Sequence, residues 1–383
     1  MVAKRNLPIS VLMIVAVLLI ISSACGSSTA VQTQPPSIEG QGINEPTTGL
    51  QEPNIPLITD TPLVTNTPQP TSTPTPLPIG LSRNYPYPSS KVVSTANWEV
   101  QVIETKRGDE AWRDIDAANM FNMAPPEGME YILVKLHVKN ISTDNDEHSI
   151  SNCDFSITGN RLINYTCGIA MVVEPEPRLD AKLFTGGEVE GWAGYLISRG
   201  ENNLILVLGE NPVQYIALDE GASIKISPDL AGIMPTNLGT TRNDPALRTE
   251  KVTTQDWELS VIDVVRGDEA WSMIQKANEY NDPPAEGMEY IAVELHARYI
   301  GTEEMAERLD AWDFSATGSA NVLYDYKYVQ EPFPPLYFSY YPGGEHEGWI
   351  VVQVAKGETG IILVYKPLTE YSDDNRRYLS LEP

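Results

Sequence analysis

The chain has 383 residues, and 52 acidic side chains against 26 lysines and arginines give it a formal net charge of −26. A surface this acidic argues against nucleic acid as a partner and against docking on anionic lipid. Four histidines, no paired-cysteine metal motif, no phosphate loop and no Ser-His-acid arrangement argue against an enzyme, and no cofactor is expected.

The N-terminus has the pattern of an export signal. Lys4 and Arg5 precede an apolar run at residues 11–21, which is about half the length that a membrane-spanning helix needs. Small residues then lead to Cys25, as in the lipobox of bacterial lipoproteins, although Ser22 stands where leucine is usual. We expect residues 1–24 to be a lipoprotein signal peptide and Cys25 to carry the lipid. An ordinary secretory peptide or an uncleaved anchor is the alternative.

Lipidation at Cys25 would hold the protein on the extracytoplasmic face of the cell membrane. Residues 25–90 are rich in Pro, Thr and Ser, with too few large apolar side chains to build a core. Alternating Thr and Pro favour polyproline II, so this segment is predicted to be a disordered tether.

The rest of the chain repeats itself. The motif Arg-Gly-Asp-Glu-Ala-Trp at residues 107–112 and the motif Glu-Gly-Met-Glu-Tyr at residues 127–131 both return 159 residues later. A Gly-Gly-Glu and Gly-Trp pattern returns at a spacing of 157, so two residues were lost in a loop. Two repeats of this size are each large enough for a core of their own. The predicted domains are residues 91–227 and 251–383, with a linker at residues 228–250.

Within each repeat the dominant hydrophobic period is two. Ile132, Val134, Leu136 and Val138 alternate with polar side chains, which is typical of a half-buried antiparallel strand. Residues 109–122 instead show helical spacing and end at a Pro-Pro pair. The sequence predicts an all-β protein of two tandem β-sandwiches, each with one short inserted helix.

The order of these motifs, from a Trp-Glu strand through Arg-Gly, Glu-Gly-Met-Glu-Tyr and Asp-Phe to Gly-Gly-Glu and Gly-Trp, carries a family resemblance. Each repeat resembles the immunoglobulin-like, telokin-like domain family of uncharacterised function found in bacterial extracellular lipoproteins. The resemblance covers residues 91–226 and 251–383. It implies an immunoglobulin-like fold and supplies no catalytic residues.

Cys153 and Cys167 are the cysteines that remain after Cys25. We expect them to form a disulfide across a hairpin whose turn is centred near Asn160, in a compartment where disulfides are permitted. The second repeat holds the aromatic residues Trp312 and Tyr326 at these positions.

Acidic residues recur at the start of the predicted helix in both repeats, and the four that head it are Asp109, Glu110, Asp268 and Glu269. Oxygen ligands of this kind suit Ca²⁺. Helix N-caps at Asp109 and Asp268, a solvated acidic face, or pairing with Arg107 are the competing explanations.

The second repeat has many more aromatic residues than the first. Tyr337, Tyr340 and Tyr341 have no tyrosine counterparts in the first repeat, where Asp180, Leu183 and Phe184 stand. We expect part of an exposed aromatic surface here, with extra packing as the competing explanation.

These features favour a non-catalytic, membrane-anchored module that binds an extracellular ligand or scaffolds envelope proteins. One alternative is a carbohydrate-binding or cell-wall-binding protein that uses the second repeat. A cation-dependent sensor or enzyme is the remaining alternative. The expected partners are the membrane, through the lipid on Cys25, and an envelope protein or cell-wall polysaccharide.

Overall fold

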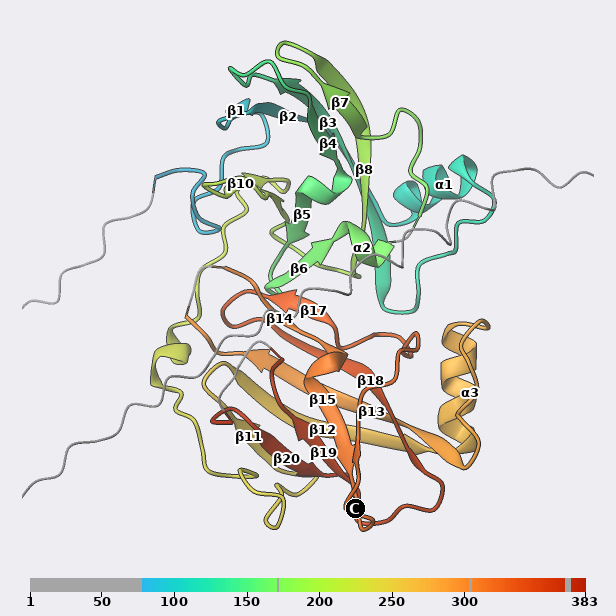
Figure 1. The fold of residues 1–383 in the computed structure, drawn as a ribbon. Coiled ribbons are helices and arrows are strands. Elements are labelled where there is room, and N and C mark those ends of the chain that lie inside the picture. The colour runs from blue at the N-terminus through green and yellow to red at the C-terminus, as the bar shows by residue number, and fades with distance from the viewer. Residues whose placement is uncertain (1–77, 171, 303–304, 369–372) are drawn as a thin grey trace, which may run out of the picture. The chain divides into compact units, whose positions relative to one another are not determined.

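The computed structural model describes residues 78–170, 172–302, 305–368 and 373–383. The predicted signal peptide, Cys25 and most of the predicted tether lie outside these residues. In the described ranges the protein is built mainly of antiparallel strands, and the two repeats carry nearly the same elements in the same order (Figure 1).

The first sheet of the first repeat contains the longest strands. Its order is β1-β2-β3-β8, with β1 (Val93–Ser94), β2 (Trp98–Arg107), β3 (Met129–Asn140) and β8 (Glu188–Ser198). Val134, Leu136 and Val138 are fully buried, whereas the polar residues between them are half-buried. The period-two pattern therefore places one face of β3 in the core, as the sequence predicts.

The second sheet of the first repeat has shorter strands in the order β10-β9-β5-β6. They are β5 (Phe155–Thr158), β6 (Ile163–Thr166), β9 (Ile205–Leu208) and β10 (Gln214–Ala217). A separate ladder joins β4 (His148–Ser151) to β7 (Asp180–Leu183), and the short helix α2 (Cys167–Ala170) follows β6. Side chains of both sheets share one hydrophobic core, which makes the repeat a β-sandwich.

The inserted helix is present in both repeats, as α1 (Asp109–Ala118) and α3 (Asp268–Ala277). In α1 the buried residues are Ala111 and Ile115, and Trp112 stacks on Tyr131 of β3 with ring centroids 5.8 Å apart. In α3 the equivalent Trp271 and Tyr290 lie 6.0 Å apart. In each repeat the Trp of the Arg-Gly-Asp-Glu-Ala-Trp motif thus packs on the Tyr of the Glu-Gly-Met-Glu-Tyr motif, and this contact holds the helix against the sheet.

The start of the helix differs from the expectation. Gly108 and Gly267, rather than Asp109 and Asp268, occupy the N-cap position, and the aspartates are the first helical residues. The chain enters each helix with φ of 61° and 68° at these glycines, a conformation that only glycine adopts readily. The aspartates still carry negative charge near the helix N-terminus, where it is favourable.

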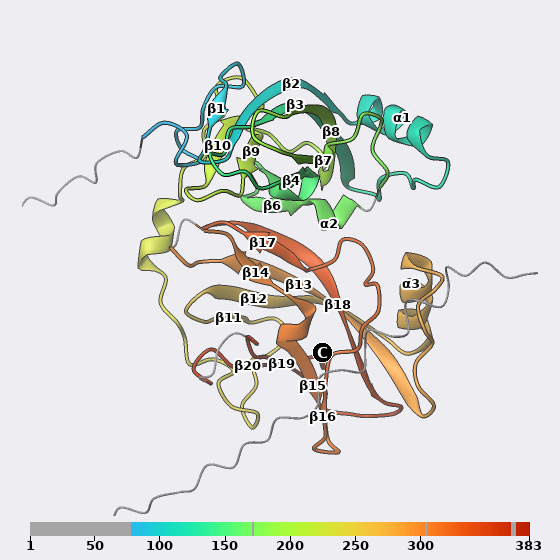
Figure 2. The same ribbon diagram turned by 45° about the horizontal axis from the view of Figure 1, so that its top comes forward.

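The second repeat has a first sheet in the same order, β11-β12-β13-β18. Its strands are β11 (Lys251–Thr253), β12 (Trp257–Arg266), β13 (Met288–Tyr299) and β18 (Glu345–Ala355). Its other sheet, β16-β15-β19-β20, contains β15 (Phe314–Thr317), β16 (Leu323–Tyr324), β19 (Ile362–Tyr365) and β20 (Arg377–Ser380). Figure 2 shows these layers from a second direction.

One ladder joins the two repeats, which the sequence does not predict. β14 (Glu307–Leu309) pairs with β17 (Phe338–Tyr340), and β17 also pairs with β6 through Tyr340 opposite Ile163. The second sheet of the first repeat is thereby extended to six strands. Each repeat nevertheless keeps a four-stranded first sheet of its own. The pairing covers an edge of β6 that would otherwise be open.

The predicted tether extends too far toward the first repeat. The amide of Tyr215 in β10 donates to the carbonyl of Gly80 at 2.9 Å, and the amide of Tyr87 donates to the carbonyl of Tyr215 at 2.8 Å. Tyr87 also forms a parallel bridge with Ile216. Residues 80–87 therefore belong to the first sandwich, and not to the tether predicted to end at residue 90.

The end of the predicted linker has the same role in the second repeat. Tyr378 of β20 donates to the carbonyl of Gly239 at 2.7 Å, and Ala246 donates to the carbonyl of Tyr378 at 2.8 Å. Gly239 and Ala246 follow Gly80 and Tyr87 by 159 residues. The sequence held a signal for this extension, because Arg-Asn-x-Pro occurs at residues 83–86 and again at residues 242–245.

The remaining part of the predicted linker begins with the short 3-10 helix η3 (Pro228–Gly232). Among the described residues, no helix combines the length and the apolar character that crossing a membrane requires.

Candidate ligand-binding cleft in the second repeat

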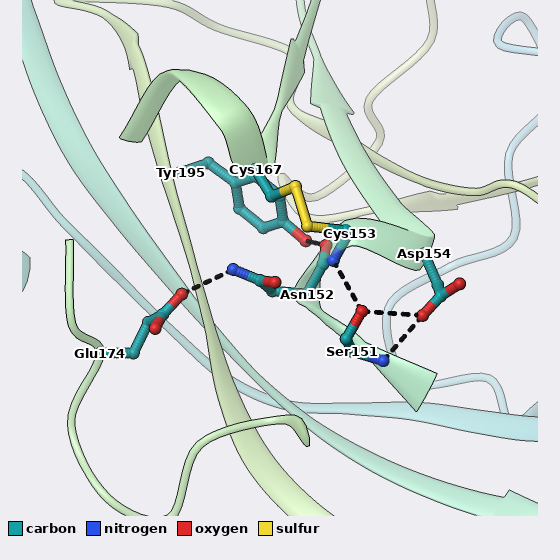
Figure 3. The surroundings of a disulfide bond; sticks show 7 residues. All are labelled: Ser151, Asn152, Cys153, Asp154, Cys167, Glu174 and Tyr195. Atoms are coloured by element: carbon teal, nitrogen blue, oxygen red, sulfur yellow. Dashed lines mark hydrogen bonds between the residues drawn. A yellow bond between two sulfur atoms is a disulfide. The ribbon is translucent and has the colours of Figure 1, made fainter. Parts of the chain in front are cut away.

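The predicted disulfide is present in the first repeat. Cys153 and Cys167 are bonded, with Cα atoms 5.1 Å apart (Figure 3). The flanking ladder pairs Ile157 with Tyr165, so the turn is centred on Arg161, one residue beyond the predicted centre. In the chain-entropy model, closing a loop of this length contributes about 3 kcal/mol. The bridge ties the residues before β5 to helix α2.

The second repeat replaces this covalent bond with two aromatic rings. Trp312 stacks on Tyr326, with ring centroids 5.5 Å apart and planes inclined by 25°. Trp312 remains 54% exposed, whereas Tyr326 is half-buried. A tryptophan this exposed on a folded domain is a candidate contact surface, because burying its large apolar face is favourable.

A half-buried polar contact next to the bridge also changes between the repeats. In the first repeat, Asn152 Nδ2 donates to Glu174 at 2.6 Å, and the Tyr195 hydroxyl donates to the Asn152 carbonyl at 2.7 Å (Figure 3). Ala311 stands where Asn152 stands, and Glu331 is the counterpart of Glu174. The second repeat therefore keeps the carboxylate and loses the amide that donates to it.

The segment that carries Glu331 is held by the residues that follow helix α3. Asn281 donates to the Gln330 carbonyl at 3.0 Å and accepts from the Gln330 amide at 2.8 Å. Asn122 holds Val173 in the same way in the first repeat, with both distances 2.9 Å. This shared anchor fixes the register of the two segments, so Glu331 and Glu174 occupy equivalent places.

The two-residue difference between the repeats lies beside this anchor. Tyr326 follows Cys167 by 159 residues, whereas Gln330 follows Val173 by 157, so the shortening falls between these positions. The first repeat forms helix α2 there, and residues 326–331 of the second repeat are extended without a helix. The second repeat therefore has no counterpart of helix α2 in the described residues that follow Tyr326.

The result is a cleft of about 150 Å³ in the second repeat. Four rings and two carboxylates dominate its lining, and these belong to Trp312, Tyr326, Tyr328, Tyr337, Asp310 and Glu331. Tyr328 is 81% exposed at the rim. Arg308 also lines the cleft and forms an ion pair with Asp310 at 2.5 Å.

Glu331 is the most deeply placed charged group of the cleft, with 4% of its surface exposed. Burial raises the pKa of this carboxyl to about 7, against the lowering effects of its backbone hydrogen bond and of the Tyr326 hydroxyl, which lies 3.3 Å away. Burial also raises the pKa of Tyr326 and Tyr337, and the negative charges of Glu331 and Asp310 raise both further. The innermost group of the cleft is thus a carboxyl that is shielded from water and carries its negative charge only in part near neutral pH.

The predicted aromatic surface is only partly correct. Tyr337 is half-buried and lines the cleft. Tyr340 is fully buried, since its hydroxyl donates to the Leu336 carbonyl at 2.8 Å and its ring lies edge-on to Trp257 at 5.2 Å. The expectation that Tyr340 is an exposed ligand residue is therefore wrong, because β17 directs this side chain into the core of the second repeat.

Tyr341 is also buried, with 4% exposure. It packs against Leu162, and the guanidinium of Arg83 lies 4.0 Å from the centre of its ring. The pairing of β17 with β6 brings it to these residues of the first repeat. Tyr341 is consequently a structural residue and not part of an exposed surface.

The acidic residues proposed for a cation do not gather at one point. Asp109 and Glu110, like Asp268 and Glu269, lie exposed in the first turns of α1 and α3. Among the residues that the structure describes, no group of three or more His, Cys, Asp or Glu side chains is placed to hold a metal ion.

Pairing with Arg107, one of the competing explanations for the repeated acidic residues, is present. Arg107 Nη2 lies 2.6 Å from Glu130, and Arg266 Nη2 lies 2.7 Å from Glu289. The partner is thus a glutamate of the Glu-Gly-Met-Glu-Tyr motif and not Asp109 or Glu110. The arginine of the repeated Arg-Gly-Asp motif, which is the last residue of β2 and of β12, is therefore already paired.

Comparison with known proteins gives no family assignment. No protein-family model and no curated protein matches the chain. Among solved structures, the ycdA protein of Bacillus subtilis subsp. subtilis str. 168, described as a putative lipoprotein, is 13% identical with a TM-score of 0.28. That match covers 34% of this chain and 38% of the ycdA chain.

Two smaller proteins are matched over nearly their whole length. The yjhA protein of Bacillus subtilis is 12% identical with a TM-score of 0.23, covering 35% of this chain and 99% of that chain. An uncharacterized β-sandwich protein of Clostridium difficile 630 is 10% identical with a TM-score of 0.23, covering 36% and 95%. No family model therefore supports the resemblance to the telokin-like family.

Proposed function

We propose that this protein is a non-catalytic lipoprotein, anchored through Cys25 on the outside of the cell membrane, that holds a surface ligand in the cleft of its second repeat. The observation that carries the proposal is Trp312, a half-exposed indole stacked on Tyr326 beside the buried Glu331. The first repeat has a disulfide and a paired carboxylate at the same place. These differences give the second repeat an exposed aromatic ring beside a buried carboxyl, which supports a binding site there.

The chemistry of the cleft fits binding better than catalysis. Its principal groups are aromatic rings, two carboxylates and one guanidinium, which together offer stacking faces, hydrogen-bond acceptors and charge. A nucleophile activated by a neighbouring base is not among the side chains described in the cleft. Cell-wall polysaccharide is the first ligand class to test, because sugars present apolar faces to rings and hydroxyls to carboxylates.

Co-sedimentation with isolated bacterial cell walls tests this proposal. Trp312→Ala is expected to weaken binding about tenfold, which corresponds to the loss of roughly 1.4 kcal/mol of stacking. Tyr280→Ala is the matched control, because Tyr280 is an aromatic side chain of the same repeat that is 85% exposed and does not line the cleft. Equal binding by wild type and Trp312→Ala, or equal weakening by both variants, would contradict the proposal.

A further inference from the structure

The size of the cleft limits what enters it. A volume of about 150 Å³ is below the roughly 300–1,000 Å³ of pockets that enclose a drug-sized ligand. A whole sugar chain is too large for this volume, whereas one compact chemical group is not. The ligand therefore reaches the cleft with one such group, and its remainder lies outside against the rim formed by Trp312 and Tyr328.

The charge of the cleft further restricts which chemical group binds there. Arg308 pairs with Asp310 and neutralises it, which leaves the charge of Glu331 without a cationic side chain among the residues that line the cleft. Burying a carboxylate in this way is costly unless an opposite charge joins it. A neutral ligand would remove more water from Glu331 and supply no charge, whereas a cation would offset the cost.

The aromatic residues favour the same kind of group. The faces of Trp and Tyr rings carry negative potential and attract cations, most strongly in sites with little water. Trp312, Tyr326, Tyr328 and Tyr337 all line the cleft. An ammonium ion with alkyl substituents suits such a site, because its bulk is apolar and its charge is spread over the surface.

We propose that this cleft binds a compact organic ammonium group, with the rings of Trp312, Tyr326, Tyr328 and Tyr337 around it and Glu331 as its counter-ion. The inference rests on the proposed function, in that the cleft is taken as the ligand site, and it names the chemical class of the group bound there. The first repeat lacks the aromatic pair and engages Glu174 with Asn152, so it does not bind this group.

The proposal implies a pH dependence. Asp310, Arg308, Tyr326, Tyr328 and Tyr337 face Glu331 across the cleft, and the carboxyl of Glu331 titrates near pH 7. The cation favours the ionised carboxylate. Its affinity therefore rises between pH 6 and pH 8, and Glu331→Gln removes this rise.

Calorimetric titration of the full mature chain with choline and with 3,3-dimethylbutan-1-ol tests the inference. The two probes have nearly the same shape, and only choline carries a charge. We expect choline to bind at least about tenfold more tightly at pH 8, and we expect Glu331→Gln and Tyr328→Ala each to weaken it about tenfold. Glu174→Gln, the same change in the first repeat, is expected to have no effect.

Equal affinity for the two probes, or no choline binding by a folded wild-type chain, would overturn the inference. Equal effects of Glu331→Gln and Glu174→Gln would do the same. Tyr328 is exposed, so its variant keeps the test valid if Glu331→Gln does not fold. If cell-wall sedimentation still depends on Trp312 while choline does not bind, the ammonium inference fails and the proposed function stands. If cell-wall sedimentation does not depend on Trp312 and choline does not bind, both the proposed function and the ammonium inference fail.

Discussion

Replacing Tyr340 with alanine is expected to lower the free energy of unfolding by about 3 to 5 kcal/mol. The side chain is fully buried, packs edge-on against Trp257 and donates a hydrogen bond to the Leu336 carbonyl. Its removal leaves a large cavity and a buried carbonyl without this donor. Urea denaturation followed by circular dichroism measures the change.

Tyr337→Ala is the matched control for this experiment. Tyr337 lies three residues earlier, is half-buried and lines the cleft, so its loss is expected to cost no more than about 1 to 2 kcal/mol. Similar small losses for both variants would show that Tyr340 is not a core residue and would restore the prediction that it lies on an exposed surface.

Replacing Cys25 with alanine is expected to release the protein from membranes completely. Several acyl chains on one cysteine anchor far more firmly than a single chain, and the preceding apolar run is too short to span a bilayer. Fractionation of cells that express each form, together with incorporation of labelled fatty acid, measures the effect. If Cys25→Ala stays in the membrane fraction without label, the signal segment is an uncleaved anchor and the proposed topology is wrong.

The strands and the duplication were readable from the sequence because both leave a local record. The alternation from Ile132 to Val138 marks which face of β3 is buried, and a period of two cannot arise from a helix. The constant spacing of 159 residues fixed the equivalence of Cys153 with Trp312 and of Cys167 with Tyr326. The two remaining cysteines predicted the disulfide, the equivalence predicted an aromatic pair in its place, and the structure contains both.

The ends of the repeats were missed because their contacts are with the backbone. Gly80 and Gly239 accept hydrogen bonds from the last strand of each sandwich through their carbonyls, which any residue could supply. The Pro and Ser residues around positions 85–90 are typical of a tether, whereas the Arg-Asn-x-Pro repeat indicates that this segment belongs to the repeated domain. The pairing of β17 with β6 left no pattern in either strand.

The sequence placed its ligand candidates in the second repeat, where the cleft lies, but two of the three candidate tyrosines are buried. Comparing the repeats identified the excess of aromatic residues in the second, but it did not distinguish exposed rings from buried ones. Tyr340 is buried against Trp257, whereas Trp312 is exposed in a repeat that has no counterpart of helix α2 among its described residues. Glu331 is a candidate because Ala311 stands where Asn152 of the first repeat donates to the equivalent carboxylate. The sequence alone does not show that residues 311 and 331 lie together.

Hydrogen–deuterium exchange tests the central claim most directly, because the duplication supplies an internal control. The full mature chain is compared with and without choline and with and without solubilised cell-wall fragments. Binding in the cleft predicts slower exchange in residues 310–316 and 326–331 with at least one of these probes, and no change in residues 151–157, the equivalents of 310–316. Equal protection of both repeats, or protection confined to other surfaces, would contradict the assignment of the cleft as the ligand site.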